Sequence, residues 1–194
     1  GEDMNLSELG IKARAASVIL AKMNVETKNM ALIACAEALV KESNSILEAN
    51  VKDVLIGREK GMNEGLVDRL MLTEERIKGI AEGLEQVAAL NDPVGEVLEM
   101  KKRPNGLLIG KKRVPLGVVG MIYEARPNVT PDAFALCFKS GNAVILRGGS
   151  DAINSNIAIV KVLQDTLKAC GITEDAVQLI EDTSHEVGTE FMKM

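Results

Sequence analysis

Two short polar segments in the second half of the chain carry residues that could bind an anion. In the first of them, Arg126 and Asn128 flank Pro127. A guanidinium beside an amide donor on a rigid loop can hold an anionic substrate and stabilise a developing oxyanion. Asparagine in such a place is, however, more often a turn residue or a helix cap. Arg126 is therefore a candidate substrate-binding residue, and Asn128 is a candidate for oxyanion support.

The second segment, Arg147-Gly148-Gly149-Ser150, follows a run of four apolar residues. Its two glycines have no side-chain bulk, so a phosphate or a ribose could approach the backbone closely beside the guanidinium of Arg147. Alternatively, the glycines only make the turn and Arg147 is a solvated charge at the end of a strand. Spacing alone leaves both interpretations open. We take Arg147, Gly148, Gly149 and Ser150 as candidate cofactor-binding residues.

Residues that could act as nucleophile, base or metal ligand are few and widely spaced. Cys35 and Cys137 lie among apolar residues, so both are expected in the core rather than as activated thiols. Cys170 is expected at the end of a helix, and His185, the single histidine, at the surface. Without a CxxC pair, the sequence predicts neither a metal site nor a disulfide framework.

Both polar segments fall where strands of a parallel sheet would end. From residue 115 onward, apolar strand-like runs at 116–122, 143–146 and 176–180 alternate with helical patterns. This alternation is typical of a doubly wound parallel sheet of the α/β class. In such sheets ligands bind beyond the carboxyl ends of the strands, where helix N-termini offer free N–H groups to phosphate. We expect Thr130 to cap the helix after the first strand.

The first half of the chain is predicted to be helical. Apolar residues recur every three or four positions from Leu6 to Met23, over 28–47 and over 74–90, and Thr73 is a plausible cap for the last of these helices. Between residues 97 and 113, two extended runs flank an Asn-Gly pair, which predicts a β-hairpin. The chain ends inside a helical pattern beside an unsealed sheet, and we expect it to be part of a longer protein.

Composition excludes several classes of function. The chain has 194 residues, 28 acidic and 23 basic side chains, a formal charge of −5, and 2% aromatic residues. No charged block or aromatic series predicts a nucleic-acid partner. No apolar run reaches the roughly 20 residues of a membrane span, and no signal peptide begins the chain. The sequence therefore predicts a cytoplasmic protein with no membrane or nucleic-acid partner.

Long motifs in the second half identify a resemblance to a known family. Residues 115–130, which include E-A-R-P-N-V-T, and residues 139–149, which end in L-R-G-G, resemble gamma-glutamyl phosphate reductase, a family of the aldehyde dehydrogenase superfamily. The resemblance extends through N-V-K-D-V at 50–54 and D-P-V-G-E at 92–96. It covers nearly the whole chain, and it corresponds to the N-terminal half of the family.

The resemblance implies reduction of L-glutamyl 5-phosphate by NADPH to L-glutamate 5-semialdehyde and phosphate, a step of proline biosynthesis, through a thioester on a cysteine. Arg147 stands where a lysine of the superfamily contacts the adenosine ribose, and Ser150 where NAD-preferring relatives carry a glutamate. A small residue at that position favours NADP. Asn128 matches the oxyanion-stabilising asparagine, and Arg126 is a candidate for the phosphate or carboxylate of the substrate.

The resemblance also implies a division of the chain and its partners. Residues 1–95 would form the N-terminal helical part of the cofactor domain, 96–114 an oligomerisation hairpin, and 115–194 the βαβαβα nucleotide-binding part. The domain with the nucleophilic cysteine is absent, so the chain alone is expected to be inactive. A homo-oligomer is the expected assembly, and glutamate 5-kinase is a second candidate partner.

Two other functions remain as alternatives at this point. One is a stand-alone nucleotide-binding module that never had a catalytic domain. The other is an acylating aldehyde dehydrogenase with a different acyl group.

Overall fold

The computed structural model describes residues 6–95, 97–102, 108–112, 115–124, 126–181 and 185–193. Its elements in chain order are α1 (Leu6–Ala21), α2 (Val25–Lys41), α3 (Ser43–Glu59), α4 (Glu64–Leu70), α5 (Glu74–Ala89), β1 (Val97–Lys102), β2 (Leu108–Lys112), β3 (Val118–Ile122), α6 (Val129–Lys139), β4 (Ala143–Arg147), η1 (Ser150–Ala152), α7 (Ile153–Ala169), η2 (Glu174–Ala176), β5 (Val177–Leu179) and α8 (His185–Met192).

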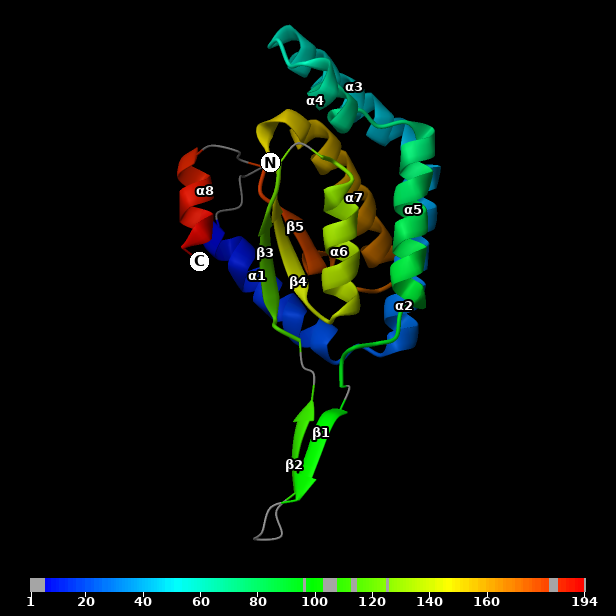
Figure 1. Ribbon diagram of the computed structural model, residues 1–194, viewed down its shortest axis with the longest axis vertical. Coiled ribbons are helices and arrows are strands. Elements are labelled where there is room, and N and C mark those ends of the chain that lie inside the picture. The colour runs from blue at the N-terminus through cyan, green and yellow to red at the C-terminus, as the bar shows by residue number, and fades with distance from the viewer. Residues whose placement is uncertain are drawn as a thin grey trace.

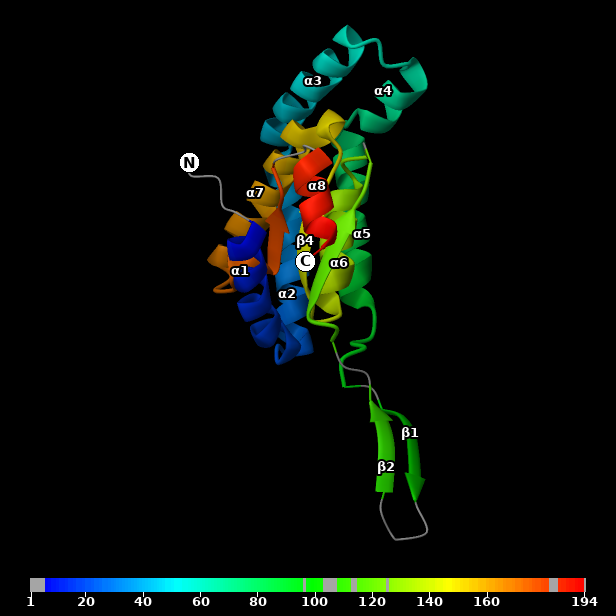
Figure 2. The same ribbon diagram turned by 90° about the vertical axis from the view of Figure 1, so that its left-hand side faces the viewer.

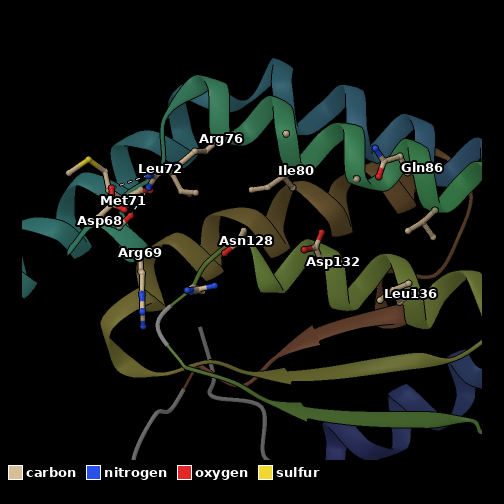
Figure 3. Close-up of a pocket in the computed structure, with 14 residues that line it drawn as sticks. Asp68, Arg69, Met71, Leu72, Arg76, Ile80, Gln86, Asn128, Asp132 and Leu136 are labelled. Atoms are coloured by element: carbon tan, nitrogen blue, oxygen red, sulfur yellow. Dashed lines mark hydrogen bonds and ion pairs between the residues drawn. The ribbon is translucent and has the colours of Figure 1, made fainter. Parts of the chain in front are cut away.

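The body of the molecule is a three-stranded parallel sheet between layers of helices. The strand order is β3-β4-β5, with Gly120 opposite Ile145 and Ile145 opposite Gln178. Helix α1 packs on one face of the sheet, and α6 and α7 pack on the other (Figure 1). Helices α2 and α5 form a further layer, in which α5 lies beside α6 (Figure 3). The predicted α/β class and parallel sheet are confirmed.

Strand β4 is the centre of the core, whereas β3 lies at an edge. The residues of β4 from Ala143 to Leu146 are buried, as its run of apolar side chains requires. On β3, exposed and half-buried residues alternate. Helix α8 approaches this strand closely, because a Cβ at Gly120 would lie only 2.8 Å from the ring of Phe191.

Two predicted helix boundaries are wrong for local reasons. The helix expected over 28–47 is broken at Glu42, whose N–H bonds to the carbonyls of Ala38 and Val40, and whose carbonyl accepts from the hydroxyl of Ser45. Serines that bond to nearby backbone favour such breaks. Helix α6 begins at Val129 with Asn128 as its N-cap, so Thr130 lies inside the helix instead of capping it. By contrast, Thr73 caps α5 as predicted.

The predicted hairpin is present as the antiparallel pair β1–β2. Met100 is opposite Gly110, and the register shifts between Val97 and Glu99. Both views show the two strands projecting away from the helices and the parallel sheet (Figures 1 and 2). The turn predicted at the Asn-Gly pair lies outside the described residues.

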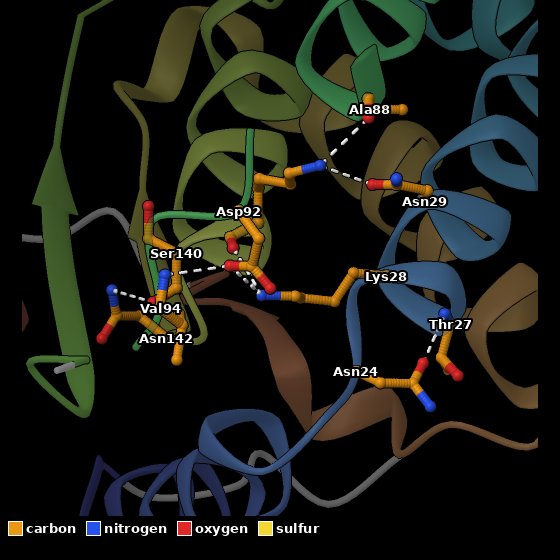
Figure 4. Close-up of polar contacts among 10 residues, drawn as sticks. Asn24, Thr27, Lys28, Asn29, Ala88, Asp92, Val94, Ser140 and Asn142 are labelled. Carbon is orange, nitrogen blue, oxygen red and sulfur yellow. Dashed lines mark hydrogen bonds and ion pairs between the residues drawn. The ribbon is translucent and has the colours of Figure 1, made fainter. Parts of the chain in front are cut away.

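A buried group of charges fixes the place where the hairpin leaves the body (Figure 4). Lys28 of α2 is fully buried, and its Nζ donates to Asp92 Oδ1 at 2.8 Å and to the carbonyl of Lys139 at 2.9 Å. The same Asp92 oxygen accepts the N–H of Val94. Lys139 Nζ donates to Asn29 Oδ1 and to the carbonyl of Ala88. Helices α2, α5 and α6 are therefore joined at one end by hydrogen bonds to buried cations.

The surroundings of Asp92 determine its pKa. Burial alone would raise the pKa of this carboxyl, but the hydrogen bonds from Lys28 and Val94 and the charges of Lys28 and Lys139 outweigh burial, so the pKa lies below its ordinary value. A carboxyl with a lowered pKa stabilises the fold above its unfolded-state pKa of about 3.9, and the stabilisation is lost as pH falls through the folded-state pKa.

We predict that Asp92→Asn lowers the free energy of unfolding by about 2–3 kcal/mol at neutral pH, because the fully buried ammonium of Lys28 loses its counter-charge. Urea unfolding followed by circular dichroism measures this difference. The gap between wild type and variant should begin to narrow below the unfolded-state pKa of about 3.9 and should close as the pH falls through the lower folded-state pKa of Asp92.

The matched control is Asp165→Asn, which removes an exposed carboxylate from its ion pair with Lys161. This variant should leave the urea midpoint unchanged, because exposed pairs contribute little. Equal midpoints for Asp92→Asn and Asp165→Asn would contradict a stabilising role for the buried group.

Candidate functional site

A cleft of about 680 Å³ lies between helices α5 and α6 (Figure 3). Asn128, Asp132 and Leu136 line it from the side of α6; they are four residues apart and share one helix face. Helix α5 contributes residues at matching helical spacing, and the end of α4 closes one side. The full lining consists of Asp68, Arg69, Met71, Leu72, Arg76, Gly79, Ile80, Gly83, Gln86, Val87, Arg126, Asn128, Asp132 and Leu136.

The structure brings Arg126 and Asn128 together at this cleft. Two backbone hydrogen bonds hold the loop between β3 and α6. The N–H of Arg126 donates to the carbonyl of Glu124, and the N–H of Val129 donates to the carbonyl of Arg126. Asn128 occupies the N-cap position of α6, yet its side chain makes no capping hydrogen bond. Its amide group is therefore available to a ligand in the cleft.

Sequence reasoning missed the opposite wall of the cleft. Gly79 and Gly83 lie inside α5, where each glycine costs about 1 kcal/mol of helix stability relative to alanine. A Cβ at Gly79 would meet nothing within 4 Å, and one at Gly83 would meet only Asp132 Oδ1, at 3.5 Å. At these two positions no side chain of α5 projects into the cleft. Glycines spaced four apart in a helical pattern were the signal in the sequence.

The arginines of the cleft differ in their roles. Arg76 donates to the carbonyls of Asp68 and Met71 and pairs with the Asp68 carboxylate at 2.9 Å, so it holds the end of α4 against α5. Arg69 and Arg126 form no side-chain hydrogen bond or ion pair with any described residue, and both are exposed. The positive charge offered to a ligand therefore comes from Arg69 and Arg126.

The second predicted site, the turn from β4 into α7, is more tightly packed than the sequence suggested. Gly148 is buried, and a Cβ there would overlap the side-chain amide nitrogen of Asn156 and crowd the ring of Tyr123. Gly148 therefore serves close packing within the chain. Gly149 is half-buried and Ser150 is exposed, so these two residues and Arg147 are the accessible part of the turn.

A chain of hydroxyl and amide groups lies beneath this turn. Thr130 Oγ1 donates to Asn156 Oδ1 at 2.8 Å. Since its single proton is used there, Thr130 accepts from the hydroxyl of Tyr123. Burial raises the pKa of Tyr123, so the phenol stays protonated and can donate. These hydrogen bonds between Tyr123, Thr130 and Asn156 link the end of β3 to α6 and α7 next to Gly148.

The N-terminus of α7 is not open to phosphate, contrary to the expectation for this edge of the sheet. The carboxylate of Asp53, a buried residue of α3, accepts the N–H of Asn154 at 3.2 Å and that of Ser155 at 2.7 Å. The same carboxylate also accepts hydrogen bonds from the side-chain amide of Asn154 and the hydroxyl of Ser155. The first N–H donors of α7 are therefore already bonded within the chain.

Cys35 and Cys137 are not activated thiols. Burial, with a smaller contribution from Cys170, raises the pKa of Cys35 to about 12. Burial also raises the pKa of Cys137.

Among the residues that the structure describes, no three His, Cys, Asp or Glu side chains are grouped as metal ligands require. In the same residues no helix combines the length and apolarity of a membrane span. His185 begins α8.

Several curated proteins similar to this chain are described as gamma-glutamyl phosphate reductases. A gamma-glutamyl phosphate reductase from Caldanaerobacter subterraneus subsp. tengcongensis is 58% identical over 183 residues, which are 94% of this chain and 44% of the relative. One from Lachnospira eligens is 55% identical over 190 residues, 98% of this chain and 46% of the relative. The chain belongs to the gamma-glutamyl phosphate reductases. No family model matches it.

Solved structures agree with this assignment. The crystal structure of gamma-glutamyl phosphate reductase from Thermotoga maritima matches with a TM-score of 0.94 and 44% identity, over 97% of this chain and 46% of that one. An acetylating aldehyde dehydrogenase from Geobacillus thermoglucosidasius has a TM-score of 0.72 at 15% identity, over 96% of this chain and 38% of that one, and shows the shared fold. The chain spans less than half the length of these relatives and corresponds to the N-terminal half of the reductase family.

We predict that Gly148→Ala destabilises the protein by about 1–3 kcal/mol, because the added methyl group overlaps Asn156 and cannot be accommodated without moving Tyr123 or α7. Thermal unfolding measures this loss. Gly79→Ala is the control, since it fills open space on a helix and should stabilise the protein by about 1 kcal/mol. A Gly148→Ala variant as stable as wild type would show that the turn is not packed as described.

Proposed function

We propose that this chain is the cofactor-binding half of an enzyme that reduces L-glutamyl 5-phosphate with NADPH to L-glutamate 5-semialdehyde and phosphate in proline biosynthesis. The observation that carries the proposal is the 55–58% identity to gamma-glutamyl phosphate reductases along 94% or more of the chain. The cleft between α5 and α6 supports it, because the two residues that match the family's substrate loop, Arg126 and Asn128, line that cleft.

The proposed roles follow from the chemistry of an acyl phosphate. Arg126 offers a guanidinium that can pair with the phosphate or the carboxylate of the substrate. Asn128 offers an amide N–H that can stabilise the negative charge which develops on the acyl oxygen when a nucleophile attacks the carbonyl carbon. The nucleophile is proposed to be a cysteine in the part of the reductase beyond this chain.

The accessible part of the β4–α7 turn fits one portion of NADPH. When bound, NADPH supplies the hydride that converts the thioester into the aldehyde. Arg147 lies at the carboxyl end of the central strand, and the exposed Ser150 brings no carboxylate that would repel a 2′-phosphate. Because Asp53 occupies the first N–H donors of α7, we assign to Arg147, Gly149 and Ser150 the phosphorylated ribose and not the pyrophosphate.

The projecting hairpin supports a homo-oligomer. Two strands alone are marginally stable, and the pair β1–β2 has two edges whose backbone groups can pair with further strands. We propose that these edges pair with another subunit of the reductase.

The function is tested on the full-length reductase that contains this chain. It should oxidise NADPH when given L-glutamyl 5-phosphate and not when given an acyl-CoA. Asn128→Ala should lower kcat about 100-fold or more through loss of the oxyanion donor, while Arg126→Ala should mainly raise KM for the substrate. Steady-state kinetics separate the two effects.

Two controls accompany these measurements. Arg58→Ala removes an exposed arginine of α3 outside the cleft and should leave both constants unchanged. The 194-residue chain alone should show no turnover, because the proposed nucleophile lies elsewhere. Turnover of acyl-CoA in place of glutamyl phosphate would assign the protein to a different acylating dehydrogenase.

We predict that Arg147→Ala in the full-length enzyme weakens NADPH about tenfold or more and NADH much less, because only NADPH carries the 2′-phosphate that the guanidinium would bind. KM values for the two cofactors measure the difference. Lys161→Ala, which removes an exposed cation of α7, is the matched control and should change neither value. An equal loss for both cofactors would refute the assignment of Arg147.

A further inference from the structure

Three charged side chains of the cleft have no hydrogen-bond or ion-pair partner among the described residues: Arg69, Arg126 and Asp132. They differ in sign, since two are guanidinium groups and one is a carboxylate. Arg76, the remaining arginine of the lining, is committed to Asp68 and Met71. A ligand that entered the cleft would therefore meet two available positive charges and one available negative charge.

Asp132 faces the open wall of the cleft. It lies one helical turn after Asn128 on the same face of α6, and its side chain points toward α5 (Figure 3). The residue opposite is Gly83, whose added Cβ would be 3.5 Å from Asp132 Oδ1. The side chain of Asp132 therefore borders space that no side chain of α5 fills.

The position of Asp132 in the first turn of α6 explains only part of this arrangement. A carboxylate there is favoured by the helix dipole, and this would hold for a solvated side chain as well. Here the side chain is exposed to the open cleft, yet partial desolvation by its surroundings raises the pKa of Asp132, and no cation of the described chain pairs with it. A carboxylate that is partly desolvated without a partner is well placed to bind a cationic group of a ligand.

We propose that Asp132 binds the α-ammonium group of the amino-acid substrate and makes the enzyme selective for acyl phosphates and aldehydes that carry a free α-amino group. The proposal rests on the proposed function, since it takes the substrate to be a glutamyl derivative whose acyl oxygen lies at Asn128.

The dimensions of the substrate fit this assignment. Asn128 and Asp132 are four residues apart on α6, which is about 6 Å along the helix axis. In an extended glutamyl chain the α-nitrogen lies about 5 Å from the acyl carbon, given bond lengths near 1.5 Å. Asn128 can therefore contact the reacting end of the substrate while Asp132 contacts its ammonium group.

The charges of the substrate also match the cleft. L-Glutamyl 5-phosphate carries a phosphate, a carboxylate and one ammonium group. Arg69 and Arg126 can pair with the two anionic groups, and Asp132 can pair with the cation. Without Asp132 the cleft would accept any molecule of similar length with two anionic groups, so this residue would provide the discrimination.

The test uses the full-length reductase in the reverse direction, where an aldehyde, phosphate and NADP⁺ give an acyl phosphate, NADPH and a proton. Two aldehydes are compared: L-glutamate 5-semialdehyde, and 5-oxopentanoate, which has the same carbon chain without the amino group. The ratio of variant to wild-type kcat/KM is taken for each aldehyde, so differences between the free aldehydes in solution cancel.

We expect Asp132→Asn to lower kcat/KM for glutamate 5-semialdehyde 10- to 100-fold, mainly through KM, and to change that for 5-oxopentanoate less than threefold. Glu82→Gln is the matched control. Glu82 is an exposed acid next to Gly83 that does not line the cleft, and its replacement should change neither value.

A second variant approaches the same contact from the opposite wall. Gly83→Ala places a methyl group in van der Waals contact with Asp132 Oδ1 and should hinder an ammonium group there. We expect it to lower kcat/KM severalfold for glutamate 5-semialdehyde and less for 5-oxopentanoate. Its melting temperature should not fall, since alanine favours the helix.

The outcomes separate this inference from the proposed function. If wild type oxidises glutamate 5-semialdehyde but Asp132→Asn affects both aldehydes equally, or neither, ammonium recognition by Asp132 is refuted and the function stands. If wild type shows no phosphate-dependent activity with glutamate 5-semialdehyde, both are refuted. Selective loss with the aminated aldehyde in both variants supports the inference.

Discussion

The buried charges of Lys28, Asp92 and Lys139 are the constraint on which the arrangement of the cleft depends. Their hydrogen bonds join α2 to the ends of α5 and α6, so one end of the α5–α6 pair is fixed. At the other end, Arg76 holds α4 against the start of α5 through the carbonyls of Asp68 and Met71. Because α5 and α6 are fixed at both ends, the space between them can remain partly unfilled, and Gly79 and Gly83 of α5 place no side chain in it.

The buried carboxylate of Asp53 limits what the carboxyl edge of the parallel sheet can bind. Asp53 accepts the first free N–H groups of α7, and Asn50 on the same face of α3 bonds to Leu70, Leu72 and Ser155. The helix terminus that would attract a phosphate is thereby neutralised from within the chain. The turn retains the half-buried Arg147, a half-buried glycine and an exposed hydroxyl, and these are the groups to which we assign the phosphorylated ribose in the proposed function.

The sequence predicted those features that depend on neighbours along the chain. The apolar run of β4, the Thr73 cap of α5 and the two runs of the hairpin are local signals, and the structure has all three. It did not predict the break at Glu42, because the helical stripe continues through it. Nor could it show that Asp53 reaches Asn154 and Ser155, since about 100 residues separate them. The helix dipole accounts for an acidic residue at position 132, and only the packing of α5 against α6 places Asp132 at a cleft.

The two candidate sites are not independent, because the loop that carries Arg126 and Asn128 is fixed at both ends to the turn from β4 into α7. At its start, the N–H of Tyr123 donates to the carbonyl of Arg147 at 3.1 Å. At its end, Thr130 donates to Asn156, which packs on Gly148. A donor can stabilise charge in a transition state only if it is held in place before the reaction. The packing around Gly148 therefore holds the loop of Arg126 and Asn128 in a fixed position relative to the turn after β4, as the roles proposed for the two sites require.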